Sequence, residues 1–81
     1  MNTISTNYLP MDRRQRRSRA ALSEALLALI AEKGFADLTV EEIANRANIT
    51  RRTFYAHFAN KHELLWATVE TVFDRLADDL T

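Results

Sequence analysis

Residues 39–58 read TVEEIANRANITRRTFYAHF, and this stretch decides the fold. Thr39 and Glu42 have the spacing of a capping box, in which each side chain binds a free backbone N–H at a helix start. Asn48 tolerates the left-handed backbone of a sharp turn, so the helix that begins after Thr39 is expected to end before Asn48 and to be short. Thr50 is a good N-cap for a following helix over about 51–57. Two short helices joined by so tight a turn predict a helix-turn-helix unit.

The second helix of this unit has an apolar back and a basic front. Ile49, Phe54 and Phe58 are expected to hold it against the rest of the protein. The side chains predicted to contact base edges lie near its N-terminus and are Thr50, Arg51, Arg52 and Thr53. A helical bundle without any DNA-binding role can contain the same turn, but a front of Arg-Arg-Thr without acidic neighbours favours DNA. We therefore predict a recognition helix over about 50–58.

A long helix is predicted before this unit, from about Asp12 to Lys33. Its apolar residues recur at helical spacing and form one stripe, made of Ala21, Leu22, Ala25, Leu26, Leu29 and Ile30. Gly34 can adopt the left-handed conformation past the last turn, which brings Phe35 towards Ile30 as in a Schellman motif. Residues 1–11 are polar and are predicted to form a disordered N-terminal arm.

A fourth helix is predicted to follow, with Asn60 as its cap and Glu63 as the capping-box partner. Its apolar stripe continues to the end of the chain through Leu65, Val69, Val72, Phe73, Leu76 and Leu80. Little of the chain remains to cover this stripe, and Trp66 is expected to be exposed with it. The predicted fold is all-α: a three-helix, homeodomain-like helix-turn-helix domain over 12–62, followed by a connecting fourth helix over 63–81.

The net charge is zero, but the charges are unevenly distributed. Residues 11–62 hold ten Lys and Arg against six Asp and Glu, whereas residues 63–81 hold one Arg against five acidic residues. The chain thus has a basic front and an acidic back, which the overall charge conceals. The densest basic cluster lies at the start of the first helix and contains Arg13, Arg14, Arg16, Arg17 and Arg19. Such a cluster is typical of a solvated helix start as well as of a phosphate contact.

Several classes of protein are disfavoured. The absence of Cys rules out disulfides and thiolate metal sites, and it is compatible with a cytoplasmic location. No apolar run approaches the length of a membrane span. His57 and His62 do not share a helix face, so a metal site there is not expected. Because the chain also lacks a nucleophile–base pair and a Gly-rich phosphate loop, we expect no enzyme activity and no cofactor.

Residues 38–65 resemble the signature of the TetR (tetracycline repressor) family of bacterial transcriptional repressors. That signature reads approximately T-x-x-x-I-A-x-x-A-G-V-S-x-x-x-[LIF]-Y-x-[HY]-F-x-[SN]-K-x-x-L, and the chain follows it without a gap from Thr39 to Leu64. There are two departures: Asn48 replaces the common Gly, and Ala56 stands where a larger aromatic residue often does. With the preceding helix, the resemblance covers about residues 12–70.

The resemblance implies functions for residues at the matching positions. The start of the recognition helix, Thr50 to Thr53, would contact bases. Phosphate contacts would come from Thr39, Tyr55, His57 and Lys61, and we add Arg13, Arg14 and Arg17 from the basic cluster. Tyr55 could instead be an aromatic residue at the rim of the core, and Lys61 a surface cation. A cation at a helix N-terminus opposes the helix dipole, however, and a phosphate partner would explain it.

The resemblance further implies a larger helical domain after this one, which would dimerise and bind a small-molecule inducer. The inducer site would then lie outside this chain. The chain would bind double-stranded DNA as part of a homodimer on a palindromic operator, and repress transcription. An alternative is a short helical interaction module that forms heterodimers through the fourth helix. Loss of activity in Arg51→Ala and Arg52→Ala would favour DNA binding, and loss in Val72→Asp and Leu76→Asp would favour the alternative.

Overall fold

The computed structural model describes residues 13–80, which form four helices connected by short loops. These are α2 (Arg13–Lys33), α3 (Val40–Ala47), α4 (Arg51–His57) and α5 (Lys61–Leu80). The predicted all-α fold with a helix-turn-helix is confirmed. The observed helix bounds agree with the predicted bounds to within about two residues. The predicted N-terminal arm lies outside the described residues. The expected boundary after residue 62 falls inside α5, which has already begun at Lys61.

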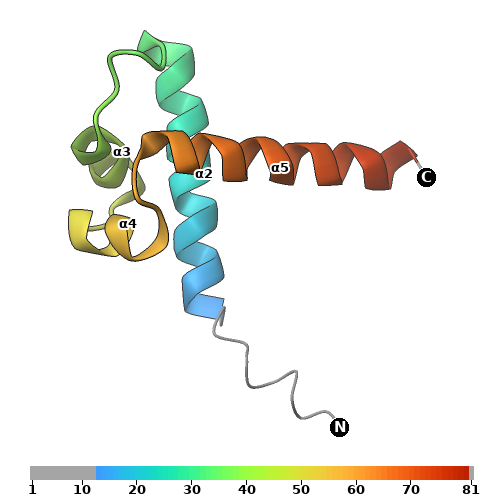
Figure 1. Ribbon diagram of the computed structural model, residues 1–81, viewed down its shortest axis with the longest axis horizontal. Coiled ribbons are helices and arrows are strands. Elements are labelled where there is room, and N and C mark those ends of the chain that lie inside the picture. Colours follow the sequence, from blue (N-terminus) through green and yellow to red (C-terminus); the bar gives the residue numbers. More distant parts are fainter. Residues whose placement is uncertain (1–12, 81) are drawn as a thin grey trace, which may run out of the picture.

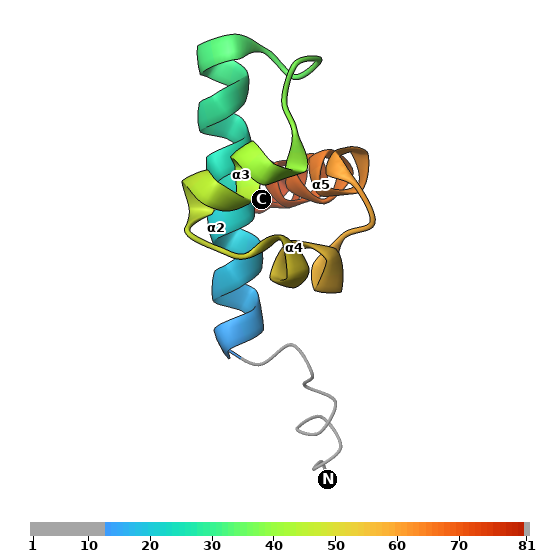
Figure 2. The same cartoon turned by 90° about the vertical axis from the view of Figure 1, so that its left-hand side faces the viewer.

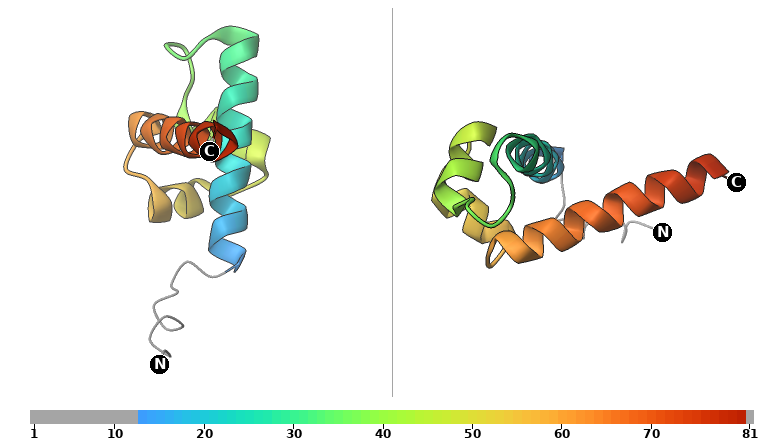
Figure 3. Two further views of the ribbon diagram at one scale, coloured as in Figure 1. Left: turned by 90° about the vertical axis from the view of Figure 1, so that its right-hand side faces the viewer. Right: turned by 90° about the horizontal axis from the view of Figure 1, so that it is seen from above.

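The long helix α2 forms the spine of the domain (Figure 1). It packs against both α3 and α5, and α3 in turn packs against α4. The two short helices lie together on one side of α2 and face the viewer in Figure 2. Helix α5 crosses α2, and its C-terminal half extends away from the other helices on the opposite side (Figure 3). The helix-turn-helix and the free end of α5 are therefore at opposite ends of the molecule.

The core lies where α2, α4 and α5 meet around the start of α3. Its largest fully buried side chains are Leu22, Leu26, Ile43, Phe54 and Leu64. Leu38 and Ile43 flank the α3 cap and both belong to this core, and they occupy the two positions of a hydrophobic staple. Helix α2 contributes one buried stripe, made of Leu22, Ala25, Leu26 and Leu29, in agreement with the spacing of its apolar residues in the sequence.

The most buried face of α5 is centred one residue before the predicted stripe, whose Leu65 packs partly buried against the core. The buried positions are Leu64 and Thr68, one residue before the Leu65 and Val69 of the predicted stripe. The Thr68 hydroxyl is satisfied, since it donates to the Leu64 carbonyl at 2.8 Å and lies 2.9 Å from Ser23 Oγ. The expected exposure of the later stripe is confirmed by the exposed side chains of Trp66, Val72, Phe73, Leu76 and Leu80.

The end of α2 also differs in detail from the prediction. Gly34 has a φ of 86°, as expected of a left-handed stop residue. Its N–H donates to the Ile30 carbonyl at 2.9 Å, which is the bond of the αL motif rather than of the Schellman motif. Ring contacts of Phe35 are with α5, where His62 lies edge-on at 5.2 Å between ring centroids. The helix therefore ends at the predicted place by a simpler turn. No described helix combines the length and the apolarity needed to cross a membrane.

Candidate nucleic-acid interface

The turn between α3 and α4 is set by Asn48. This residue has φ 61° and ψ 44°, the left-handed conformation that the sequence predicted. Its N–H donates to the Asn45 carbonyl at 3.0 Å, and the N–H of Ile49 donates to the Ala44 carbonyl at 2.8 Å. These two bonds form a Schellman motif. Ile49 packs against the core, so the turn is anchored at the point where the chain changes direction.

Helix α4 begins at the predicted cap. Thr50 has an extended backbone, and its Oγ1 accepts a hydrogen bond from the Thr53 N–H at 3.0 Å. The hydroxyls of these two residues also lie 3.0 Å apart. Thr53 is half-buried, so both predicted threonines are partly engaged within the helix start. The two arginines of the same turn are exposed, which makes them the principal donors on this surface.

Helix α4 has two distinct faces. Phe54 is fully buried and Phe58 is 5% exposed, with their ring centroids 5.9 Å apart. The opposite face is exposed and carries Arg51, Arg52, Tyr55 and Ala56. Tyr55 is 49% exposed, and its ring packs edge-on against Phe54 at 5.3 Å between centroids, so it lies at the rim of the core and at the surface. No acidic residue occurs in α4. The exposed face is therefore basic and is held rigidly by the two phenylalanines.

His57 is half-buried at the end of α4. Burial lowers its pKa below 6.5, and the nearby positive charge of Arg19 lowers it further. The Arg19 guanidinium itself lies 4.6 Å from the centroid of the Phe58 ring, in a cation–π contact. His57 is thus neutral at neutral pH, and a neutral imidazole still offers one N–H to an acceptor.

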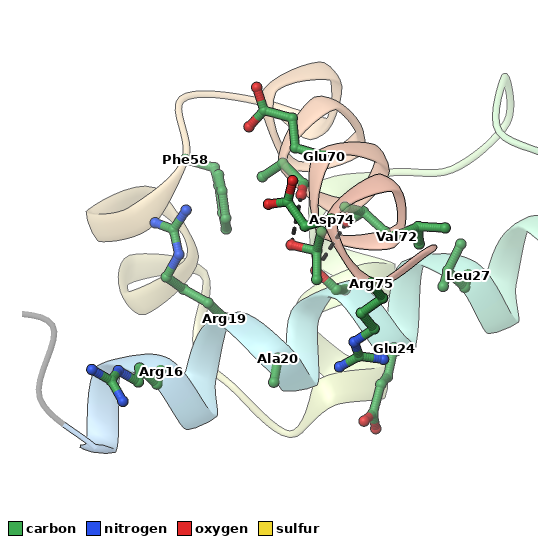
Figure 4. Close-up of a pocket in the computed structure, with 14 residues that line it drawn as sticks. Arg16, Arg19, Ala20, Glu24, Leu27, Phe58, Glu70, Val72, Asp74 and Arg75 are labelled. Atoms are coloured by element: carbon green, nitrogen blue, oxygen red, sulfur yellow. Dashed lines mark hydrogen bonds between the residues drawn. The ribbon is translucent and has the colours of Figure 1, made fainter. Parts of the chain in front are cut away.

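The basic cluster of α2 divides between two faces of the helix. Arg16 and Arg19 line a groove between α2 and α5, together with Phe58 and Arg75 (Figure 4). Arg13, Arg14 and Arg17 are exposed and do not line this groove. Helical spacing places these three within about 100° of one another. The three arginines predicted to contact phosphate therefore share a surface that the groove does not occupy.

Thr39 forms the predicted capping box at the start of α3. Its Oγ1 accepts from the Glu42 N–H at 3.1 Å, and its own N–H donates to Glu42 Oε1 at 3.0 Å. Lys33 donates to the other oxygen of Glu42 at 2.7 Å. The hydrogen bond from Lys33, followed by the one from Thr39, lowers the pKa of Glu42. Thr39 is exposed, so it remains accessible at the N-terminus of α3.

Lys61 has partners that the sequence did not indicate. Its Nζ donates to the carbonyls of Phe35 at 2.8 Å, Leu38 at 2.9 Å and Ala36 at 3.1 Å. An ammonium group has three donors, and all three are used here. The predicted phosphate contact of Lys61 therefore has no donor left in this arrangement. These partners lie more than 20 residues away in sequence, and local spacing carries no signal for them.

Most of the predicted DNA-contacting residues lie on or beside the two short helices, which pack against each other. Residues 50–53 and Tyr55 lie on α4, and Thr39 caps the neighbouring α3. Sequence reasoning missed Glu32 and Arg46, which pair at 2.8 Å and join the end of α2 to α3. Among residues 13–80, no three His, Asp or Glu side chains are grouped so as to hold a metal ion.

Proteins of known sequence resemble this chain over most of its length. An uncharacterized HTH-type transcriptional regulator of Bacillus subtilis, YxbF, is 43% identical over 72 residues, covering 88% of this chain and 19% of its own. The HTH-type transcriptional regulator TcmR of Streptomyces glaucescens is 35% identical, covering 88% of this chain and 34% of its own. The probable acrEF/envCD operon repressor of Escherichia coli is 32% identical, covering 80% and 31%. No solved structure matches the chain significantly.

This chain spans between about a fifth and a third of the length of these relatives. Residues 22–68 match the family described as bacterial regulatory proteins, tetR family. That match begins in α2, includes the whole helix-turn-helix and ends in the buried part of α5. The chain therefore belongs to the TetR family of bacterial regulatory proteins.

Proposed function

We propose that this chain is the operator-binding part of a bacterial transcriptional regulator, with α4 lying in the major groove of DNA. The observation that carries the proposal is the division of α4 into two faces. Phe54 and Phe58 fix the helix in the domain, while Arg51 and Arg52 are exposed on a helix that has no acidic side chain. Such a surface suits the acceptor atoms of bases and phosphates.

The proposed contacts fall into two classes. Arg51 and Arg52 bind base edges, where a guanidinium can pair with the two acceptors of guanine, and Thr50 and Thr53 add weaker contacts. Phosphates are bound at the N-terminus of α3 by Thr39, near the exposed face of α4 by Tyr55 and His57, and at the start of α2 by Arg13, Arg14 and Arg17. The phosphate contacts set affinity and its dependence on salt, and the base contacts set sequence preference.

We further propose that the complete regulator is a homodimer on a palindromic operator, and that it represses transcription. Two copies would place their α4 helices about 34 Å apart, in successive major grooves. One relative is named as an operon repressor, which supports repression over activation. A dimerisation and inducer-binding region would then lie in the part of such regulators that this chain does not cover. DNA binding would take place in the cytoplasm, at the nucleoid.

The test is a selection of duplexes from a random library, followed by fluorescence anisotropy from about 50 to about 200 mM salt. The expected result is binding that weakens with salt and is lost in the Arg51→Ala/Arg52→Ala double variant. The matched control is Arg16→Ala/Arg75→Ala, which removes the same charge from the α2–α5 groove and should retain binding. Equal losses in the two double variants, or binding insensitive to salt, would contradict a recognition surface on α4.

The interaction-module alternative is less favoured, because the relatives are named as transcriptional regulators of the helix-turn-helix type. It predicts activity that depends on Val72 and Leu76 rather than on Arg51 and Arg52. The same titration with Val72→Gln/Leu76→Gln therefore separates the two functions.

A further inference from the structure

The contact between Lys61 and the loop before α3 gives this lysine an unusual environment. Its Nζ is surrounded by the carbonyls of Phe35, Ala36 and Leu38, at 2.8, 3.1 and 2.9 Å. It also lies 4.4 Å from the centroid of the Phe35 ring. Charge-assisted hydrogen bonds are roughly twice as strong as neutral ones, and the ring adds a cation–π contact. The ammonium group is thus fully occupied by residues of this chain.

The position of Lys61 makes this contact informative. It is the first residue of α5, where a positive charge opposes the helix dipole and needs a compensating partner. The loop carbonyls supply that partner without any phosphate. His62, the next residue, packs edge-on against the Phe35 ring at 5.2 Å. The first turn of α5 therefore binds the loop in two ways, through the loop's backbone carbonyls and through the ring of Phe35.

The loop bound by Lys61, residues 35–38, leads directly into the start of α3. Leu38, whose carbonyl accepts from Lys61, also donates its N–H to the Phe35 carbonyl at 3.1 Å. The next residue is Thr39, whose N–H and hydroxyl form the capping box with Glu42. The orientation of the α3 N-terminus consequently depends on a contact made by α5.

We propose that Lys61 is a positioning residue that binds no phosphate itself. It holds residues 35–38, and through them Thr39, in the orientation that DNA binding requires. This inference rests on the proposed function, because it assigns a position to Thr39 in a DNA complex. It reverses the phosphate contact that the family resemblance implies for this lysine.

The test compares Lys61→Met, Lys61→Arg and the control Arg75→Met, which removes one charge from the far end of the same helix. Each is titrated with a fluorescein-labelled duplex recovered by the selection above, between about 50 and about 200 mM salt. We expect both Lys61 variants to weaken binding at least about fivefold without changing the slope against salt. An arginine cannot direct three donors at carbonyls around a single atom, so it should not rescue binding. A direct phosphate contact predicts a slope reduced by about 0.9 in Lys61→Met and nearly normal binding in Lys61→Arg, which would overturn the proposal.

Hydrogen exchange provides a readout that does not need DNA. In Lys61→Met, the amides of Leu38 and Thr39 should exchange at least about tenfold faster, while the amides of Leu26 and Phe54 keep their protection. Unchanged exchange at Leu38 and Thr39 would overturn the proposal. Faster exchange throughout the core would also overturn it, because it would make Lys61 a contributor to global stability only.

A double variant tests whether the two sites act together. Thr39→Asp keeps a good N-cap but places a negative charge where a phosphate is proposed to bind. Its fold-loss of DNA affinity should be smaller in the Lys61→Met background than in the original chain, because a displaced Thr39 no longer lies on the phosphate. Equal losses in both backgrounds would overturn the positioning role. A chain that shows no salt-sensitive binding before any substitution would instead contradict the proposed function.

Discussion

Arg51 and Arg52 are exposed on a helix that is fixed in the domain, and this determines how their loss should appear. Each substitution to Ala should cost about 1–3 kcal/mol of discrimination at one base position. The free energy of unfolding should stay within about 0.5 kcal/mol, because neither side chain is part of the core. Anisotropy with a set of single-base variants of the selected duplex measures the first quantity, and thermal denaturation the second. Weakening that is uniform across all base variants would mean that the arginine contacts phosphate only.

Thr39 carries two functions that substitution can separate. Thr39→Ala removes the cap and should lower the free energy of unfolding by about 1 kcal/mol. Thr39→Asp keeps the cap, so its stability should be close to that of the original chain while its affinity for DNA falls. Thermal denaturation and anisotropy on the two variants measure both effects. Normal DNA binding by Thr39→Asp would place the phosphate backbone away from the α3 N-terminus.

His57 predicts a dependence of stability on pH. Its folded pKa lies below the unfolded value of 6.5, so the unfolded chain takes up a proton at a higher pH than the folded chain does. The free energy of unfolding should therefore decrease as pH falls through about 6.5, until the folded pKa is passed. Melting temperatures at about pH 8 and about pH 5.5 should differ less in His57→Gln than in the original chain. An equal difference in both would assign the dependence to other groups.

At the scale of the helices, the sequence correctly predicted the features that depend on residues close together along the chain. Thr39, Asn48 and Thr50 act on neighbours within a few residues, and each was found in its expected conformation. The α5 cap was only half correct, since Glu63 accepts from the Ala59 N–H at 2.9 Å whereas a capping box would use that of Asn60. The buried face of α5 and the partners of Lys61 depend on contacts with α2 and its following loop. Both follow from how the helices pack, which local spacing does not reveal.

The left-handed Asn48 sets the angle between α3 and α4, and it permits a matched pair of substitutions. Asn48→Ala should lower the free energy of unfolding by about 1 kcal/mol, because a Cβ without a local polar partner is disfavoured at this φ. Asn48→Gly, the residue common in the family at this place, should be neutral to within about 0.5 kcal/mol. Urea denaturation of the two variants measures the difference. Equal stabilities would mean that the backbone relaxes out of the left-handed region.

At the scale of the whole molecule, residues 13–80 present a basic surface on α4 and an exposed apolar surface on α5. Phe73 is 66% exposed and Leu76 is 52% exposed on the free half of α5. Contiguous apolar surface of this kind favours association, so the chain should self-associate as its concentration rises. Val72→Gln/Leu76→Gln should reduce this association without lowering the melting temperature, since both side chains are exposed. Sedimentation velocity over a concentration series measures it, and an unchanged distribution would place the association elsewhere.

The opposite placement of the helix-turn-helix and the free end of α5 has a consequence for the approach to DNA. Exposed arginines lie on α4 and at the start of α2, whereas Glu70, Asp74 and Asp79 outnumber Arg75 on the projecting half of α5. The field of a polyanion exerts a torque on these separated charges. It turns the basic side towards the duplex, although the net charge is zero. Encounters are thereby pre-oriented, and the benefit appears in the association rate rather than in the lifetime of the complex. Neutralising Glu70, Asp74 and Asp79 would make the net charge positive. It would nevertheless reduce the fraction of collisions that begin with the basic side facing the duplex.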